Sequence, residues 1–179
     1  MDTLRTKLDG LIRKNAKFFS MKLTTRRENP FVLQEDYHLS TPVVNELFSW
    51  GLQMTVSITG KNRVHLMMFL DPIVVDNTTR PAFIQFANAA NMRLDAALGK
   101  FCVNENNDFY YECYLPGFFG DNLRELEQQL FDIPFSHFQT CLTPLMQLKD
   151  GKWDADIAIS YYDELWDAGV IDNSKYGLW

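Results

Sequence analysis

The stretch from residue 80 to 116 constrains the fold most, because a helical pattern passes there directly into a strand pattern. Apolar residues recur at helical spacing between Phe83 and Leu98, and Gly99 ends that pattern. The segment Lys100 to Pro116 alternates with the period of two that is typical of a β-hairpin. Two strand patterns also precede the helix, so the order strand pair, helix, strand pair predicts an α+β fold.

The first two predicted strands differ in character. Between residues 52 and 59, apolar and polar side chains alternate, which indicates a strand with one wet face. The stretch Val64 to Leu70 is apolar on both sides, as expected of a more central strand, and we expect Pro72 to interrupt it. Residues 60–63 have the composition of the turn that joins the two strands.

Helical patterns occupy both ends of the chain. The spacing of leucines and phenylalanines predicts a basic first helix over residues 4–19 and a loop over 21–40, with Asn29-Pro30 as a break and a short strand at 31–33. Thr41-Pro42 predicts the start of a short helix over 42–50.

Three helices are predicted after the hairpin. We expect one capped by Asp121, a second separated from it by Pro134, and a last one from Asp154 to Ala168 with Gly169 as its stop. The expected organisation is therefore a basic helix and loop over 1–40, an α+β core over 41–151, and an acidic helix and tail over 152–179.

Composition and charge narrow the function classes. The chain has 179 residues, 46% of them hydrophobic, which suits one folded domain. Residues 1–27 hold eight Lys/Arg and two Asp, whereas residues 28–179 hold nine Lys/Arg and 21 acidic residues. Since only the first helix is basic, we expect no nucleic-acid partner. The apolar side of this first helix packs most simply against protein. No apolar run approaches the length of about 20 residues that crosses a bilayer, so we expect no membrane partner.

The cysteines and the N-terminus favour the cytoplasm. Cys102, Cys113 and Cys141 are an odd number without CxxC spacing, as expected of buried thiols in a reducing compartment. Met1 to Ser20 lacks the continuous apolar segment of a secretory signal.

No sequence motif points to catalysis, a cofactor or a metal. Phosphate-loop, dinucleotide, zinc-protease and serine-hydrolase patterns are absent, so we expect no enzyme and no cofactor. Residues 104–108 and 150–156 are rich in carboxylates and amides, but neither has the ligand spacing of a calcium loop. We interpret both as turns, the first being the hairpin turn itself.

Part of the chain resembles a known family. Residues 83–91, the step Leu98 to Val103 and the strand 109–112 after an acidic turn occur in an order that is similar to the YbjN-type sensory transduction regulators. The resemblance covers residues 42–151, and the fold of that family resembles that of type III secretion chaperones. It implies an antiparallel sheet built from two strand pairs flanking a central helix, with additional N- and C-terminal helices. It also implies a non-enzymatic, dimeric domain that binds polypeptide or acts in regulation.

Protein binding is the leading functional hypothesis. A sheet with aromatic side chains on both faces leaves apolar area that one helix layer cannot cover, and such area commonly marks an association surface. The candidate binding residues are Trp50, Tyr110, Tyr114 and Trp153. We hypothesise a homodimer that captures a segment of another protein, although the terminal helices could instead cover these side chains.

Two alternatives stay open. An enzyme with dispersed catalytic residues would place His38 or His65 beside a carboxylate or thiol in a pocket. A small-ligand sensor would enclose an apolar cavity lined by Met54, Met67 and Phe69.

Overall fold

The computed structural model describes residues 4–27, 35–44, 49–59, 63–94, 96–167 and 171–178, with backbone only for 25–27, 35–44, 49, 50, 71 and 72. The chain forms two compact units. Unit 1 comprises residues 1–72, 97–100 and 110–134, and unit 2 comprises residues 73–96, 101–109 and 135–179.

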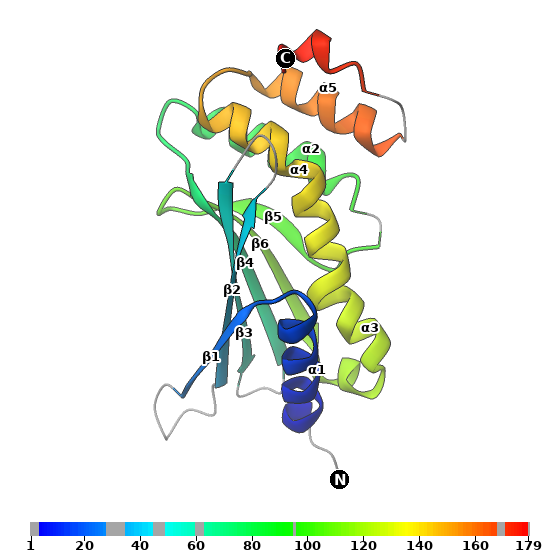
Figure 1. The fold of residues 1–179 in the computed structure, drawn as a ribbon. Helices are drawn as coiled ribbons and strands as arrows, with labels where there is room; N and C mark the ends of the chain where they lie inside the picture. Colours follow the sequence, from blue (N-terminus) through cyan, green and yellow to red (C-terminus); the bar gives the residue numbers. More distant parts are fainter. Residues whose placement is uncertain are drawn as a thin grey trace. The chain divides into compact units, whose positions relative to one another are not determined.

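The fold is mixed α+β with an antiparallel sheet, as predicted (Figure 1). Its helices are α1 Leu4–Phe18, α2 Arg80–Asn91, α3 Leu123–Glu127, α4 Ile133–Lys149 and α5 Ala155–Trp166. The strands are β1 Lys22–Arg27, β2 Glu35–Val44, β3 Ser49–Thr59, β4 Arg63–Val74, β5 Lys100–Val103 and β6 Asp108–Pro116. Short helical turns follow at η1 Gly117–Asp121, η2 Gln128–Asp132 and η3 Asn173–Tyr176. Hydrogen bonding orders the strands β1-β2-β3-β4-β6-β5.

In unit 1, β3 and β4 share one buried face. Met54 pairs with Met68 and Val56 pairs with Leu66, and all four side chains are buried. Helix α1 buries an apolar stripe and contacts η1 and α3. Lys14 Nζ lies 2.8 Å from a carboxylate oxygen of Glu127 and forms an ion pair between α1 and α3.

The region before residue 50 differs from the prediction. Residues 22–27 and 35–40, expected to be loop, belong to β1 and β2, so the expected domain boundary at residue 40 falls inside β2. The predicted helix over 42–50 is wrong, because residues 42–44 pair in the sheet with 49–51. Sheet pairing outweighs the local Thr-Pro start signal, and the β-branched Val43 and Val44 suit a strand. The predicted short strand at 31–33, the Asn29-Pro30 break and residues 45–48 lie outside the described residues.

Pro72 does not interrupt β4, which continues to Val74. The recorded pairing of β4 with β3 ends at Asp71 opposite Gly51. Beyond that point no pairing with β3 requires an N–H donor from residue 72, so a proline is tolerated. The expected turn at 60–62 lies outside the described residues.

In unit 2, α2 packs against α5 and the hairpin. The rings of Phe83 and Phe109 lie 5.7 Å apart, and those of Phe86 and Tyr162 also lie 5.7 Å apart. Helix α2 ends at Asn91, earlier than the predicted Leu98. The Asn91 side chain accepts from the Phe101 N–H at 2.7 Å and donates to its carbonyl at 2.9 Å. These bonds join the end of the helix to β5 in place of a further helical turn.

The later helices follow the prediction in part. Asn122, and not Asp121, caps α3 by accepting from the Glu125 N–H at 3.2 Å. Pro134 does not separate two helices, because the chain stays helical from α3 through η2 into α4. The π-helical turn η2 directly precedes this proline, so the regular α-helical hydrogen bonding is already interrupted there. Asp154 caps α5 as expected, and the predicted stop at Gly169 lies outside the described residues.

Candidate protein-binding surface

One face of β4 and β6 carries partly exposed side chains, all in unit 1. Alternate residues of both strands are buried, and the intervening ones form a second face. We call this second face the outer stripe. It consists of Arg63, His65, Met67 and Phe69 on β4 and of Tyr110, Glu112, Tyr114 and Pro116 on β6.

Two stacked ring pairs join the strands across the outer stripe. The rings of His65 and Tyr114 lie 4.2 Å apart at 3°, and those of Phe69 and Tyr110 lie 5.5 Å apart at 24°. Because residue numbers rise along β4 while they fall along β6, these contacts correspond to an antiparallel pair. Such aromatic pairs are worth about 0.5–1.5 kcal/mol beyond their buried area.

A polar cluster links three side chains of the stripe. His65 Nε2 lies 3.0 Å from Glu112 Oε1, and the Tyr114 hydroxyl donates to the same oxygen at 3.0 Å. The Tyr114 side chain is nevertheless 55% exposed. An exposed aromatic ring is therefore fixed by a stacking partner and a hydrogen bond.

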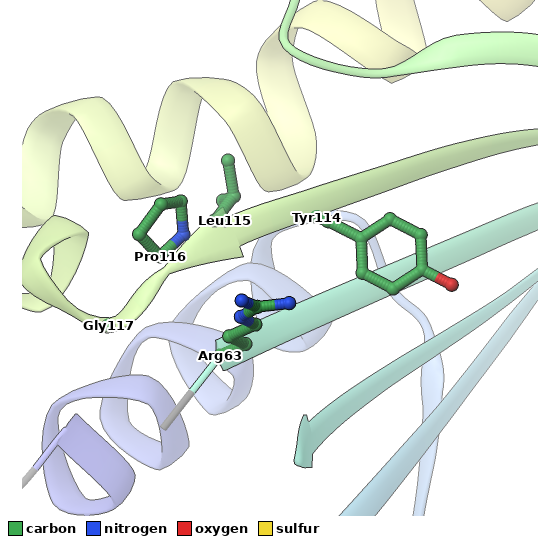
Figure 2. A pocket seen from close by; sticks show the side chains of 5 residues that line it. All are labelled: Arg63, Tyr114, Leu115, Pro116 and Gly117. Carbon is green, nitrogen blue, oxygen red and sulfur yellow. The ribbon is translucent and has the colours of Figure 1, made fainter. Parts of the chain in front are cut away.

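A hollow of about 290 Å³ opens at one end of the stripe, lined by Arg63, Tyr114, Leu115, Pro116 and Gly117. Figure 2 shows the Arg63 side chain beside β6, between the rings of Pro116 and Tyr114. Leu115 points to the other side of the strand and is fully buried. Among the described residues, the hollow thus combines one cation with two ring surfaces.

Strand β3 borders the outer stripe with polar side chains. The register places Thr59 opposite Arg63, Ser57 opposite His65, Thr55 opposite Met67 and Gln53 opposite Phe69. Paired residues share a face of the sheet, so this border lies on the same side as the stripe. The aromatic surface is consequently narrow on the β3 side.

The structure separates the four sequence-predicted binding residues. Tyr110 and Tyr114 both lie on the outer stripe. Trp153 belongs to unit 2 and is only 7% exposed, with its indole N–H donating to the Tyr176 carbonyl at 2.9 Å. A C-terminal segment therefore covers Trp153, which was the alternative to its role in binding. Trp50 lies in β3, but its side chain is outside the described residues, as is that of His38.

Sequence reasoning did not select Arg63 or Glu112, and it named His65 only for the enzyme alternative. The available signal was the alternation within β4, where Arg63, His65, Met67 and Phe69 occupy every second position. The prediction that this strand is apolar on both sides leaves out the polar members of its second face.

The lining proposed for a ligand-sensing cavity does not form. Met54 pairs with Met68 and faces the buried side, whereas Met67 and Phe69 lie on the outer stripe. Because successive side chains of a strand point to opposite faces, these three residues cannot enclose one cavity.

Cys113, Cys141 and His137 are buried, whereas Cys102, also expected to be buried, is only half-buried. Burial raises the pKa of the Cys113 thiol to about 12 and that of Cys141 well above its ordinary value. Burial lowers the pKa of His137 to about 4. Within the described ranges, no group of three or more His, Cys, Asp and Glu side chains could hold a metal ion. The predicted turn at 104–108 is confirmed, with Asn107 at φ 67°.

Comparison with known proteins gives no further assignment. No family model, curated protein or solved structure matches the chain. The resemblance to YbjN-type regulators therefore stays a prediction. In the part of the chain that the structure describes, no helix is both long and apolar enough to cross a membrane.

Proposed function

We propose that this protein is a non-enzymatic, chaperone-like or regulatory domain that binds a segment of another protein along the outer stripe of β4 and β6. The observation that carries the proposal is Tyr114, which is 55% exposed yet held by the His65 ring and by Glu112. A ring that is already ordered loses little conformational entropy on binding, and Tyr is among the side chains that dominate binding energy at interfaces.

The family resemblance supports the same class of function. We propose a YbjN-type regulator that forms a homodimer in the cytoplasm, a compartment in keeping with its three free cysteines. Light scattering at micromolar concentration should give the dimer mass, and a monomer mass throughout would contradict this part of the proposal.

The binding proposal is tested with a displayed library of random peptides of about 12 residues, long enough to follow one strand of the stripe. Peptides recovered on the wild-type protein should lose at least about tenfold in affinity for a Tyr110→Ser, Tyr114→Ser double variant. Phe18→Ser is the matched control, since Phe18 is an exposed aromatic residue on α1 and is not a member of the stripe. Recovery of no peptide, or equal loss in the control, would contradict the proposal.

An enzyme is the second candidate, because His65 does lie beside a carboxylate. The His65–Glu112 contact and the position of Ser57 opposite His65 place a Ser, a His and a Glu across three neighbouring strands. Ser57 is only 4% exposed, which opposes a role as nucleophile. Turnover of a panel of activated esters that is lost in both Ser57→Ala and His65→Ala would favour the enzyme over the binding domain.

A further inference from the structure

We infer that the hollow at Arg63 receives the carboxylate of an Asp or Glu side chain in the bound segment. This inference rests on the proposed binding function and adds the chemistry of the partner to it. Among the described residues, the structure assigns no hydrogen bond or ion pair to the Arg63 guanidinium, which is exposed. Guanidinium groups recognise carboxylates through two parallel hydrogen bonds.

The nearest carboxylate on the stripe is already engaged. Glu112 accepts from the Tyr114 hydroxyl and contacts His65, both at 3.0 Å and through the same oxygen. Arg63 instead lies between Tyr114 and Pro116, whose rings supply apolar walls (Figure 2). The cation therefore remains available to a carboxylate from outside.

The charge of unit 1 permits an acidic partner. Unit 1 holds 12 Lys/Arg and 12 Asp/Glu, whereas unit 2 holds five Lys/Arg and 11 Asp/Glu. The net charge of -6 thus belongs to unit 2, and the unit that carries the hollow is neutral. No net repulsion from unit 1 opposes the approach of an acidic side chain.

The lining of the hollow suits a carboxylate side chain. Its volume of about 290 Å³ lies just below the range for small-molecule sites, which runs from about 300 to 1,000 Å³. One guanidinium with two ring walls fits a planar carboxylate that continues into an aliphatic stem. A phosphate group would usually meet several cations or backbone N–H groups.

The geometry of the stripe sets where the acid must lie in the bound segment. Arg63 and Phe69 are six residues apart on β4, or about 20 Å at strand spacing. A segment that runs along the two strands matches their residue spacing when it is itself extended. We therefore expect an extended segment with an Asp or Glu about six residues from an apolar or aromatic residue that contacts Phe69 and Tyr110.

The peptide selection is repeated on Arg63→Glu to test this inference. Wild-type selections should enrich Asp or Glu about six residues from an apolar anchor, and Arg63→Glu selections should replace that acid by Lys or Arg. A selected peptide should lose about fivefold in affinity for Arg63→Gln, the effect expected of a partly exposed ion pair. Changing its acid to the amide should cause the same loss, and combining both changes should cost no more than either alone.

The control is Arg124→Glu, because Arg124 is exposed on α3 in the same unit. It should leave both the enriched pattern and the affinities unchanged. Peptides that need Tyr114 but show no acidic position, and bind Arg63→Gln as tightly as wild type, would overturn the inference while the proposed function stands. Acids enriched at helical spacing, or only at the peptide C-terminus, would also overturn it. Failure to recover any peptide would instead contradict the proposed function.

Discussion

His137 is a buried histidine whose environment disfavours its charged form. Its ring stacks on Trp166 of α5 at 5.5 Å, and its Nδ1 has no hydrogen-bond partner among the described residues. Burial lowers its pKa to about 4, below the ordinary value of 6.5. The folded protein therefore stays neutral at this site in a pH range where the unfolded chain takes up a proton.

This difference makes the folded protein less stable as the pH decreases. Between pH 7 and pH 5, the unfolded state binds more protons than the folded state, so His137 should reduce the free energy of unfolding by about 2 kcal/mol. His137→Phe keeps the stacked ring and should remove that decrease. Urea unfolding of both proteins at the two pH values checks the expectation. An equal pH dependence in the variant would show that His137 is not the group responsible.

Glycine is required at position 99 because Tyr111 and Glu112 lie close to its backbone. A Cβ at this position would collide with the buried ring of Tyr111 and would lie 2.7 Å from the Glu112 carbonyl oxygen. Gly99→Ala should therefore lower the free energy of unfolding by about 1–3 kcal/mol in urea titrations. Gly10→Ala is the control, because a Cβ there meets nothing within 4 Å. Within α1, alanine should raise stability by about 0.5–1 kcal/mol. Similar effects at both positions would contradict this explanation.

At the scale of elements, Asn91 connects α2 to β5. Its side chain satisfies both the N–H and the carbonyl of Phe101, at 2.7 and 2.9 Å. Asn91→Ala should cost about 2 kcal/mol of stability, because it leaves two partly buried backbone groups without this partner. Asn88→Ala, at an exposed position of the same helix, should change stability by less than about 0.5 kcal/mol. Thermal or urea unfolding distinguishes the two variants.

Elements with a strong local period could be predicted from the sequence. Helices α1 and α5, the alternating strand at 52–59 and the hairpin of β5 and β6 each match their pattern. Strands β1 and β2 could not, since β1 lacks that alternation and the alternation in β2 spans only Asp36 to Ser40, close to the break signal at Asn29-Pro30. Strand β1 is also an edge strand, where charged residues such as Lys22 and Arg26 are common. The helix start predicted at Thr41-Pro42 and the strand end predicted at Pro72 were wrong because these local signals carry no information about the pairing of strands.

At the scale of the whole molecule, the candidate surface depends on pairing between distant segments. Tyr110 and Tyr114 could be selected from the alternation of their own strand. The cluster that holds Tyr114 could not, because His65 and Glu112 lie 47 positions apart in the chain. Only the register of β4 against β6 brings them together, and a single sequence does not contain that register.

The central claim is that a polypeptide binds along the outer stripe, and chemical-shift mapping of the backbone amides tests it most directly. A peptide selected on the wild-type protein is titrated into the isotopically labelled full chain. Perturbed amides should cluster at residues 63–69 of β4 and 110–115 of β6, and the Tyr110→Ser, Tyr114→Ser double variant should show little change. Perturbations concentrated on α2 and α5, with β4 and β6 unaffected, would contradict the claim.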